Sequence, residues 1–214
     1  MRRRHLMAAF TGQNLTCIRG ERHVFEGLDF AIEDGGALML TGPNGSGKTS
    51  LLRLMAGLRG PDAGAICWQG IAITDDPDAH HARLCFVGHG NAVKASLSVE
   101  ENLTFWATLH GTEEKVPAAL GIFGLDRLAD LPARFLSAGQ RRRLTLSRLC
   151  VTDAPLWLLD EPETALDTQA MNSLRDAIAR HRDHGGIVVF ATHGDDMPPG
   201  HTTLELVVAA WKGV

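Results

Sequence analysis

Short apolar runs, each closed by glycine, proline or charged residues, divide the chain into regular units. Runs of this length and composition are typical of buried strands. They predict strands over residues 14–18, 28–32, 37–40, 84–87, 156–159 and 187–191. Weaker patterns predict a short strand pair within residues 62–73 and an edge strand over residues 204–211.

Other segments place leucine and further apolar residues at helical spacing. They are residues 50–58, 99–110, 141–151 and 168–182. The stretch from about 92 to 150 is the richest in helix formers and predicts a helical insertion. Neither a repeat nor a linker interrupts the pattern, so we expect one α/β domain over residues 1–214, with a mostly parallel sheet.

Composition narrows the class of protein. An apolar fraction of 44% and a charged fraction of 21% are ordinary for a soluble globular chain. The net charge of −4, without a dense Lys/Arg stripe, leads us to expect no nucleic-acid partner. Cys17, Cys67, Cys85 and Cys150 are widely spaced and form no CxxC pair, which favours a reduced, cytosolic protein over a disulfide framework or a zinc site.

The basic start, Met1–His5, resembles the beginning of a signal peptide, but the apolar stretch behind it spans only residues 6–10. A signal peptide needs about 7–15 apolar residues and a membrane span about 20. We therefore expect the chain to reach a membrane only by docking onto another subunit.

His80 and His81 follow three aspartates within residues 75–78. Histidines and carboxylates can form a metal cluster, but this spacing matches no known metal site. The segment therefore predicts a solvated loop.

A glycine-rich segment lies between the predicted strand 37–40 and the predicted helix 50–58. It consists of Gly42, Pro43, Asn44, Gly45, Ser46, Gly47, Lys48 and Thr49, followed by Ser50. Its spacing is that of a phosphate loop, whose backbone N–H groups and following helix N-terminus bind phosphate. We expect Lys48 to reach the β- and γ-phosphates of ATP and Thr49 to place its hydroxyl on Mg²⁺. An ordinary glycine-rich turn is the alternative, which the strand–loop–helix context disfavours.

Two acids, Asp160 and Glu161, close the apolar run 156–159. Adjacent residues of a strand face opposite sides, so we expect the two carboxylates to have different tasks. A helix cap made by a pair of acids is the alternative, which a phosphate loop in the same chain disfavours.

The pentapeptide Leu136-Ser137-Ala138-Gly139-Gln140 lies upstream of these acids and directly before the arginines 141–143. A serine hydroxyl and free backbone N–H groups at a helix N-terminus suit a terminal phosphate. Ser137 can also simply cap the helix, with the three arginines as a solvated face. The two roles of Ser137 are compatible.

Together with the phosphate loop and the acidic strand, Leu136–Gln140 resembles the signature of ATP-binding cassette (ABC) transporter ATPase subunits. The resemblance implies a P-loop NTPase fold of the ABC type, with a mostly parallel sheet, an antiparallel β portion and an inserted helical subdomain. It also implies a site completed by a second copy of the chain. Ser137, Gly139 and Gln140 would then contact ATP held by the partner, and Asp167 would lie in a D-loop across the dimer contact.

The same resemblance assigns catalytic roles. Asp160 would hold Mg²⁺ through water, and Glu161 would orient or deprotonate the attacking water. His193, directly behind the predicted strand 187–191, stands where the family has a histidine that senses the γ-phosphate. Lys48, Glu161 and His193 are the expected catalytic residues. A surface or core histidine is the alternative for His193.

The chain departs from the family pattern in two places. It has no tyrosine, and the position of the aromatic residue that stacks on adenine is Arg19, whose guanidinium can also stack on a base. Phe25 is a weaker candidate for the same contact. Gly90 stands in the position of a glutamine near the metal and the membrane partner, and His89 or Asn91 could replace that glutamine.

A narrower resemblance is to the ATPase subunits of the bacterial cytochrome c biogenesis system, which act in heme export. It rests on residues 86–94, 101–106, 109–111, 139–144 and 155–162. It implies peripheral subunits on the cytoplasmic face of the inner membrane, bound to integral membrane subunits. ATP hydrolysis there would drive heme export or the release of a heme-loaded chaperone.

Two alternatives stay open. One is the ATPase subunit of an ABC transporter for another substrate. The sequence contains no substrate pocket, so it does not exclude this alternative. The other is a soluble, non-transport ABC ATPase. Such proteins usually carry tandem cassettes or a long insertion, and this chain has a single short cassette.

Overall fold

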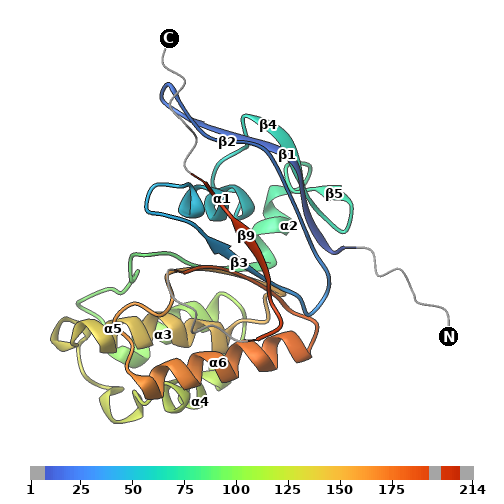
Figure 1. The fold of residues 1–214 in the computed structure, drawn as a ribbon. Helices are drawn as coiled ribbons and strands as arrows, with labels where there is room; N and C mark the ends of the chain where they lie inside the picture. Colours follow the sequence, from blue (N-terminus) through green and yellow to red (C-terminus); the bar gives the residue numbers. More distant parts are fainter. Residues whose placement is uncertain (1–7, 193–198, 208–214) are drawn as a thin grey trace.

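Among the described residues, a parallel sheet of five strands forms the centre of the protein. The computed structural model describes residues 8–192 and 199–207 (Figure 1). The strands run in the order β6 (Leu84–Val87), β7 (Leu156–Asp160), β8 (Ile187–Ala191), β3 (Ala37–Thr41) and β9 (Thr202–Glu205). Every neighbouring pair is parallel, as the sequence predicts.

Side chains of the central strands alternate between two cores. In β7, Leu156 and Leu158 pack into a core with α1 (Lys48–Met55) and the antiparallel strands. Trp157 and Leu159, on the opposite face, pack into a core with the helices on the other side. Burial of both faces explains why these strands are continuous apolar runs rather than alternating ones.

A second, antiparallel sheet covers one side of the parallel sheet. Its strands run in the order β2 (Arg22–Ile32), β1 (Phe10–Arg19), β4 (Ala63–Trp68) and β5 (Ile71–Ala72). β1 and β2 both begin earlier than predicted. The residues that the prediction missed, 10–13 and 22–27, form no continuous apolar run. Gly12 lies there beneath the Phe30 ring, which a Cβ at Gly12 would approach to 2.2 Å.

Helices cover the other side of the parallel sheet (Figure 1). Between β6 and β7 the regular elements are all helical. They are α3 (Val99–Thr108), η1 (Glu113–Lys115), α4 (Val116–Ile122), η2 (Asp126–Leu128), η3 (Ala133–Phe135), α5 (Ala138–Ser147) and η4 (Arg148–Val151). α6 (Thr168–Asp183) follows β7 and packs on the same side.

The solvated loop expected around the two neighbouring histidines is wrong. Asp76 accepts a hydrogen bond from the Ala79 N–H and caps α2 (Pro77–Ala82). This helix buries His80 completely, with its Nε2 2.8 Å from the Met55 carbonyl oxygen. Burial lowers the pKa of His80.

The observed bounds of one helix and one strand differ from the predicted ones. The expected helix 141–151 begins earlier, as α5, because Ser137 caps it, and it continues after Ser147 as a short 3-10 helix. The expected edge strand 204–211 corresponds to β9, which lies at the edge of the parallel sheet. Residues 208–211 lie outside the described residues.

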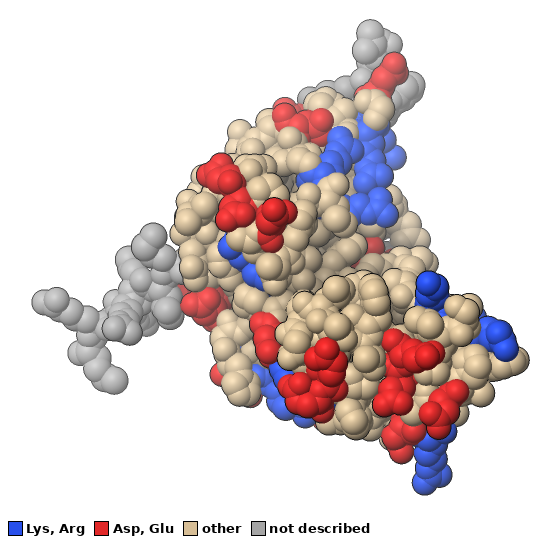
Figure 2. Space-filling view, turned by 180° about the vertical axis from the view of Figure 1, so that it is seen from behind, with Lys and Arg blue, Asp and Glu red and all other residues tan. Residues whose placement is uncertain are grey.

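Charged side chains are unevenly distributed on the face seen in Figure 2. Asp and Glu gather over the helical part of this face, and Lys and Arg lie mostly at its margins. Within the described part of the chain, none of the helices combines the length and the apolar character that crossing a membrane requires.

Candidate active site

The glycine-rich segment connects β3 to α1, in the strand–loop–helix context that the sequence predicts. Gly42 has φ +131°, and a Cβ there would lie 2.1 Å from the Leu206 carbonyl oxygen. Gly47 has φ +108°, and a Cβ there would lie 2.5 Å from the Val24 side chain. Both positions therefore require glycine, and the backbone is held in a tight turn at the carboxyl end of β3.

Lys48 and Ser46 give this loop its polar interior. The Lys48 Nζ donates to the carbonyl oxygens of Gly42 at 2.7 Å and Pro43 at 3.3 Å. The Ser46 hydroxyl is buried and, among the described residues, has no hydrogen-bond partner. A buried hydroxyl, an ammonium and a glycine cradle together fit a polyphosphate. Burial lowers the pKa of Lys48, and Glu161 and Asp160 oppose that shift.

A cavity of about 300 Å³ opens directly above the loop. Its lining residues are Arg19, Arg22, Val24, Asn44, Gly45, Gly47, Lys48, Thr49, Ser50 and Glu161. Arg19 thus reaches the cavity, where it could stack on a base. Phe25 does not, because it is buried beside Gly47. Arg22 also lines this cavity, although it belongs to no motif in the sequence.

Thr49 and Asp160, the predicted metal residues, lie side by side although 111 positions separate them. The Thr49 hydroxyl donates to the Asp160 carboxylate, with oxygen–oxygen distances of 3.0 and 3.2 Å. Burial raises the pKa of Asp160, and the Thr49 hydrogen bond opposes that shift without cancelling it. Hydroxyl and carboxylate oxygens are ligands that Mg²⁺ prefers, so this pair fits that ion.

Glu161 leaves the strand instead of continuing its alternation. It has φ +49°, in the left-handed region, and its N–H donates to the Ala191 carbonyl oxygen at 2.9 Å. The expectation that the two acids face opposite sides is therefore wrong. Asp160 and Glu161 line one cavity of about 400 Å³, which adjoins the first at Thr49.

The loop after β6 forms the far wall of that second cavity. Gly90 lies there with open space where a side chain would stand. His89 points its Nδ1 to 3.8 Å from the Glu161 carboxylate. Asn91 is instead held through its carbonyl oxygen by the Thr145 hydroxyl. Of the two candidates for replacing the glutamine, only His89 lines the cavity.

The signature pentapeptide stands away from both cavities of its own chain. Ser137 and Gln140 form a capping box: the Ser137 Oγ accepts from the Gln140 N–H at 3.2 Å, and the Gln140 side chain accepts from the Ser137 N–H at 2.8 Å. A Cβ at Gly139 would lie 2.9 Å from the Ala165 carbonyl oxygen, so the segment 164–167, which corresponds to the expected D-loop, runs close by. Asp167, at the end of that loop, caps α6 through the Ala170 N–H.

His193 lies outside the described residues. The residue before it, Thr192, is buried at the end of β8 and donates its hydroxyl to Glu163. Glu163 follows the acid pair closely in sequence and is a further polar group that the sequence analysis did not select.

The alternative of a solvated face for residues 141–143 is contradicted at its central residue. Arg142 is only 3% exposed. It donates hydrogen bonds to backbone carbonyl oxygens of residues 160–162, here called the acid loop, and of Gly88 in the loop after β6. No pattern in the sequence signals this, because the carbonyl partners lie 18 to 54 positions away.

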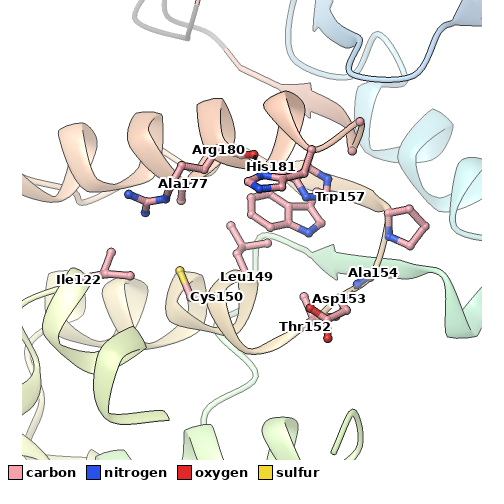
Figure 3. Close-up of a pocket in the computed structure, with 14 residues that line it drawn as sticks. Ile122, Leu149, Cys150, Thr152, Asp153, Ala154, Trp157, Ala177, Arg180 and His181 are labelled. Atoms are coloured by element: carbon pink, nitrogen blue, oxygen red, sulfur yellow. Dashed lines mark hydrogen bonds between the residues drawn. The ribbon is translucent and has the colours of Figure 1, made fainter. Parts of the chain in front are cut away.

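A larger cavity, of about 500 Å³, lies at the opposite end of the parallel sheet (Figure 3). It is lined by residues before the first positions of β7 and β8, among them Ala154 and Gly186. Ligands of open α/β sheets bind beyond the carboxyl ends of the strands, where the phosphate loop and the acids lie. We therefore place the active site at the two smaller cavities.

A stacked ring pair forms part of the larger cavity's wall. The His181 imidazole lies over the Trp157 indole, with ring centroids 3.8 Å apart and planes inclined by 9° (Figure 3). Gly186 makes room for the imidazole, since a Cβ there would lie 2.2 Å from the His181 Nε2. Burial lowers the pKa of His181 to about 4.

The half-buried His181 should make the protein less stable in mild acid. Its folded pKa lies below the unfolded value of about 6.5, so its contribution is complete above pH 6.5 and is lost as the pH falls towards 4. The full shift corresponds to about 3 kcal/mol, which partial exposure of the ring reduces to about 2 kcal/mol. Urea unfolding of the wild type and of His181→Gln between pH 7 and pH 4 measures this.

The His181→Gln protein should lose less free energy of unfolding over that range than the wild type. His184→Gln, at the exposed end of the same helix, is the matched control for removing a histidine. Equal losses in the wild type and in His181→Gln would show that another group carries the acid sensitivity.

Comparison with known proteins agrees with this geometry. Residues 25–164 match the family model described as ABC transporter. The protein named "Cytochrome c biogenesis ATP-binding export protein CcmA" from Paramagnetospirillum magneticum is 52% identical, over 93% of this chain and 94% of its own. The protein of the same name from Rhodospirillum rubrum is 54% identical, over 93% of this chain and 86% of its own.

Solved structures show the same fold. The ATP-binding subunit of an ABC transporter superposes with a TM-score of 0.83 at 23% identity, over 94% of this chain and 88% of that chain. An ATP-binding cassette solved as a dimer, with ADP and phosphate bound after hydrolysis, superposes with a TM-score of 0.79 at 23% identity, over 94% of this chain and 97% of that chain.

Proposed function

The chain belongs to the ABC transporter family, and we propose that it is the ATP-hydrolysing subunit of a membrane complex in c-type cytochrome biogenesis. The observation that carries this proposal is the pair of relatives more than half identical along nearly the whole chain, both named for cytochrome c biogenesis and ATP-dependent export. The arrangement of the phosphate loop and the two acids supports the ATPase part.

In this proposal ATP occupies the cavity above the phosphate loop. Its phosphate oxygens would accept hydrogen bonds from backbone N–H groups of the loop 42–49, in which only Pro43 lacks one, with the Lys48 ammonium and the Ser46 hydroxyl beside them. Its base lies towards Arg19, whose guanidinium replaces the usual aromatic residue.

Thr49 and Asp160 would hold Mg²⁺, Asp160 through water. The ion, when bound, neutralises charge on the β- and γ-phosphate oxygens. Glu161 lines both cavities at their junction, so its carboxylate can orient or deprotonate water directed at the γ-phosphate. His193 follows β8, whose end lies beside Glu161, and would contact the same phosphate.

A second copy of the chain would complete each site. Ser137 is exposed at the N-terminus of α5, outside its own chain's cavities, and Asp167 is exposed at the start of α6. A helix N-terminus with an exposed serine suits a terminal phosphate presented by another subunit. Ser137, Gly139 and Gln140 would thus contact ATP bound by the partner copy.

Integral membrane subunits would bind beside the loop after β6. Phe105 on α3 is 56% exposed, and Leu109 just after the helix is 63% exposed. Leu109 and Phe86 line a cavity of about 290 Å³, and Phe86 also lines the cavity that contains Glu161. A membrane subunit seated there would touch the wall of the active site. The chain would then be peripheral, on the cytoplasmic face of the inner membrane.

The process driven would be heme export or the release of a heme-loaded chaperone. A strain whose only copy of the gene encodes Lys48→Ala should lose c-type cytochromes while it keeps b-type cytochromes, because ATP hydrolysis would fail. Heme staining and absorbance spectra of membranes measure both classes.

Lys115→Ala, which removes a surface lysine paired with Asp153, is the matched control and should mature cytochromes normally. Normal c-type cytochromes in a Lys48→Ala strain with wild-type protein levels would refute the proposed function.

A further inference from the structure

The guanidinium of Arg142 joins three segments of the chain. It lies on α5, five residues after Ser137, and is buried. Its Nη1 donates to the Gly88 carbonyl oxygen at 3.0 Å, in the loop after β6. Its Nη2 donates to the carbonyl oxygens of Asp160 at 3.0 Å and Glu161 at 2.7 Å. Its Nε donates to that of Pro162 at 3.3 Å.

These bonds act on the backbone of the acid loop. The Glu161 N–H is bonded to the Ala191 carbonyl oxygen, and the Glu161 carbonyl oxygen is bonded to Arg142. Glu161 adopts a left-handed backbone conformation that a residue with a side chain rarely takes. Hydrogen bonds on both sides of this residue therefore hold its backbone, and with it the direction in which its side chain leaves the chain.

Nearby carboxylates compensate the positive charge of the buried Arg142 guanidinium. Burial lowers its pKa, and the nearby carboxylates of Glu163, Asp160 and Glu161 oppose that shift. A planar fork with five donors can serve several carbonyl oxygens at once, which a lysine cannot. The arrangement is specific to a guanidinium at this position.

We propose that Arg142 is a positioning residue, which sets Glu161 for catalysis and ties it to the helix that presents Ser137. The inference rests on the proposed ATPase function. One end of α5 faces the nucleotide of the partner copy, and Arg142 on the same helix holds the acid that acts on the chain's own nucleotide. A movement of α5 when two copies of the chain pair would therefore move Arg142. Through the Arg142 hydrogen bonds it would displace Glu161 and, at Gly88, the loop after β6.

The test compares steady-state ATP hydrolysis by Arg142→Lys, Arg142→Gln and the wild type. Misplacing a catalytic group by about 1 Å can lower a rate about 100-fold, so we expect kcat to fall about 10- to 100-fold. KM for ATP should stay within about twofold, because the phosphate loop is unchanged. Arg143→Gln is the matched control: it removes the neighbouring guanidinium, which donates one 3.3 Å bond to the Phe123 carbonyl oxygen. It should keep kcat.

A double-mutant cycle separates positioning from general damage. In a Glu161→Gln background, Arg142→Lys should lower the residual rate less than about twofold, because its effect passes through the Glu161 carboxylate. Arg142→Lys keeps a cation in place if Arg142→Gln fails to fold. A wild-type kcat in folded Arg142→Lys, or losses that multiply in the double variant, would overturn the inference. Neither result would touch the proposed function, which wild-type hydrolysis tests separately.

Discussion

Replacing Glu161 by glutamine should lower the rate of ATP turnover at least about 100-fold, because general-base catalysis typically contributes about 10²- to 10⁴-fold. Glutamine has nearly the shape of glutamate, and the backbone bonds from Glu161 to Ala191 and Arg142 do not involve the carboxylate. The substitution therefore removes the base and leaves the geometry of the acid loop. ATP affinity should change less than about twofold, since we propose that the loop 42–49 binds the phosphates.

Two assays check this expectation: steady-state phosphate release, and binding of a fluorescent ATP analogue. Glu114→Gln, on the exposed η1 helix, is the control for losing one carboxylate. A Glu161→Gln protein that turns over ATP within about threefold of the wild type would remove Glu161 from the role of general base.

The second large effect is expected from Ser137→Arg. In the proposed dimer, an arginine at this position would fill the space assigned to the partner's terminal phosphate, so ATP turnover should fall at least about 100-fold. The substitution also removes a helix cap, which costs about 1 kcal/mol of stability. Loss of the cap alone would not abolish turnover.

Ser98→Arg separates the two causes. Ser98 caps α3 with the same capping box, in which its Oγ accepts from the Glu101 N–H and the Glu101 carboxylate accepts from the Ser98 N–H. This variant should lose similar stability and keep its ATPase rate. Thermal unfolding together with phosphate release measures both quantities. Equal rate losses in the two variants would mean that the cap, and not the phosphate contact, is what Ser137 supplies.

Much of this architecture could be predicted because its signals are local. The strands β3, β7 and β8 are buried on both faces, so each is a continuous apolar run bounded by turn residues. The glycine-rich loop could be predicted because its backbone conformation requires glycine at positions 42 and 47, and these glycines are visible in the sequence. The contact between Thr49 and Asp160 follows from two motifs at the carboxyl ends of strands in one sheet.

The features that escaped prediction depend on distant partners. Arg142 is polar and lies in a polar helix, and only carbonyl oxygens of remote loops make its burial favourable. His80 is buried because its Nε2 meets the Met55 carbonyl oxygen of another helix. Glu161 departs from strand alternation because it follows the last residue of β7 and turns into the left-handed region, with φ +49°. The periodicity of apolar and polar residues does not predict hydrogen bonds between residues that are distant in the sequence.

The central claim is that ATP bound by one copy of the chain is contacted by Ser137 of a second copy. Sedimentation of Glu161→Gln with ATP and Mg²⁺ tests it most directly, because this variant should hold unhydrolysed ATP. We predict an ATP-dependent dimer for Glu161→Gln and for Glu161→Gln/Ser98→Arg. For Glu161→Gln/Ser137→Arg we predict a monomer that still binds one ATP. A Glu161→Gln/Ser137→Arg protein that dimerises with ATP as readily as Glu161→Gln would contradict the account.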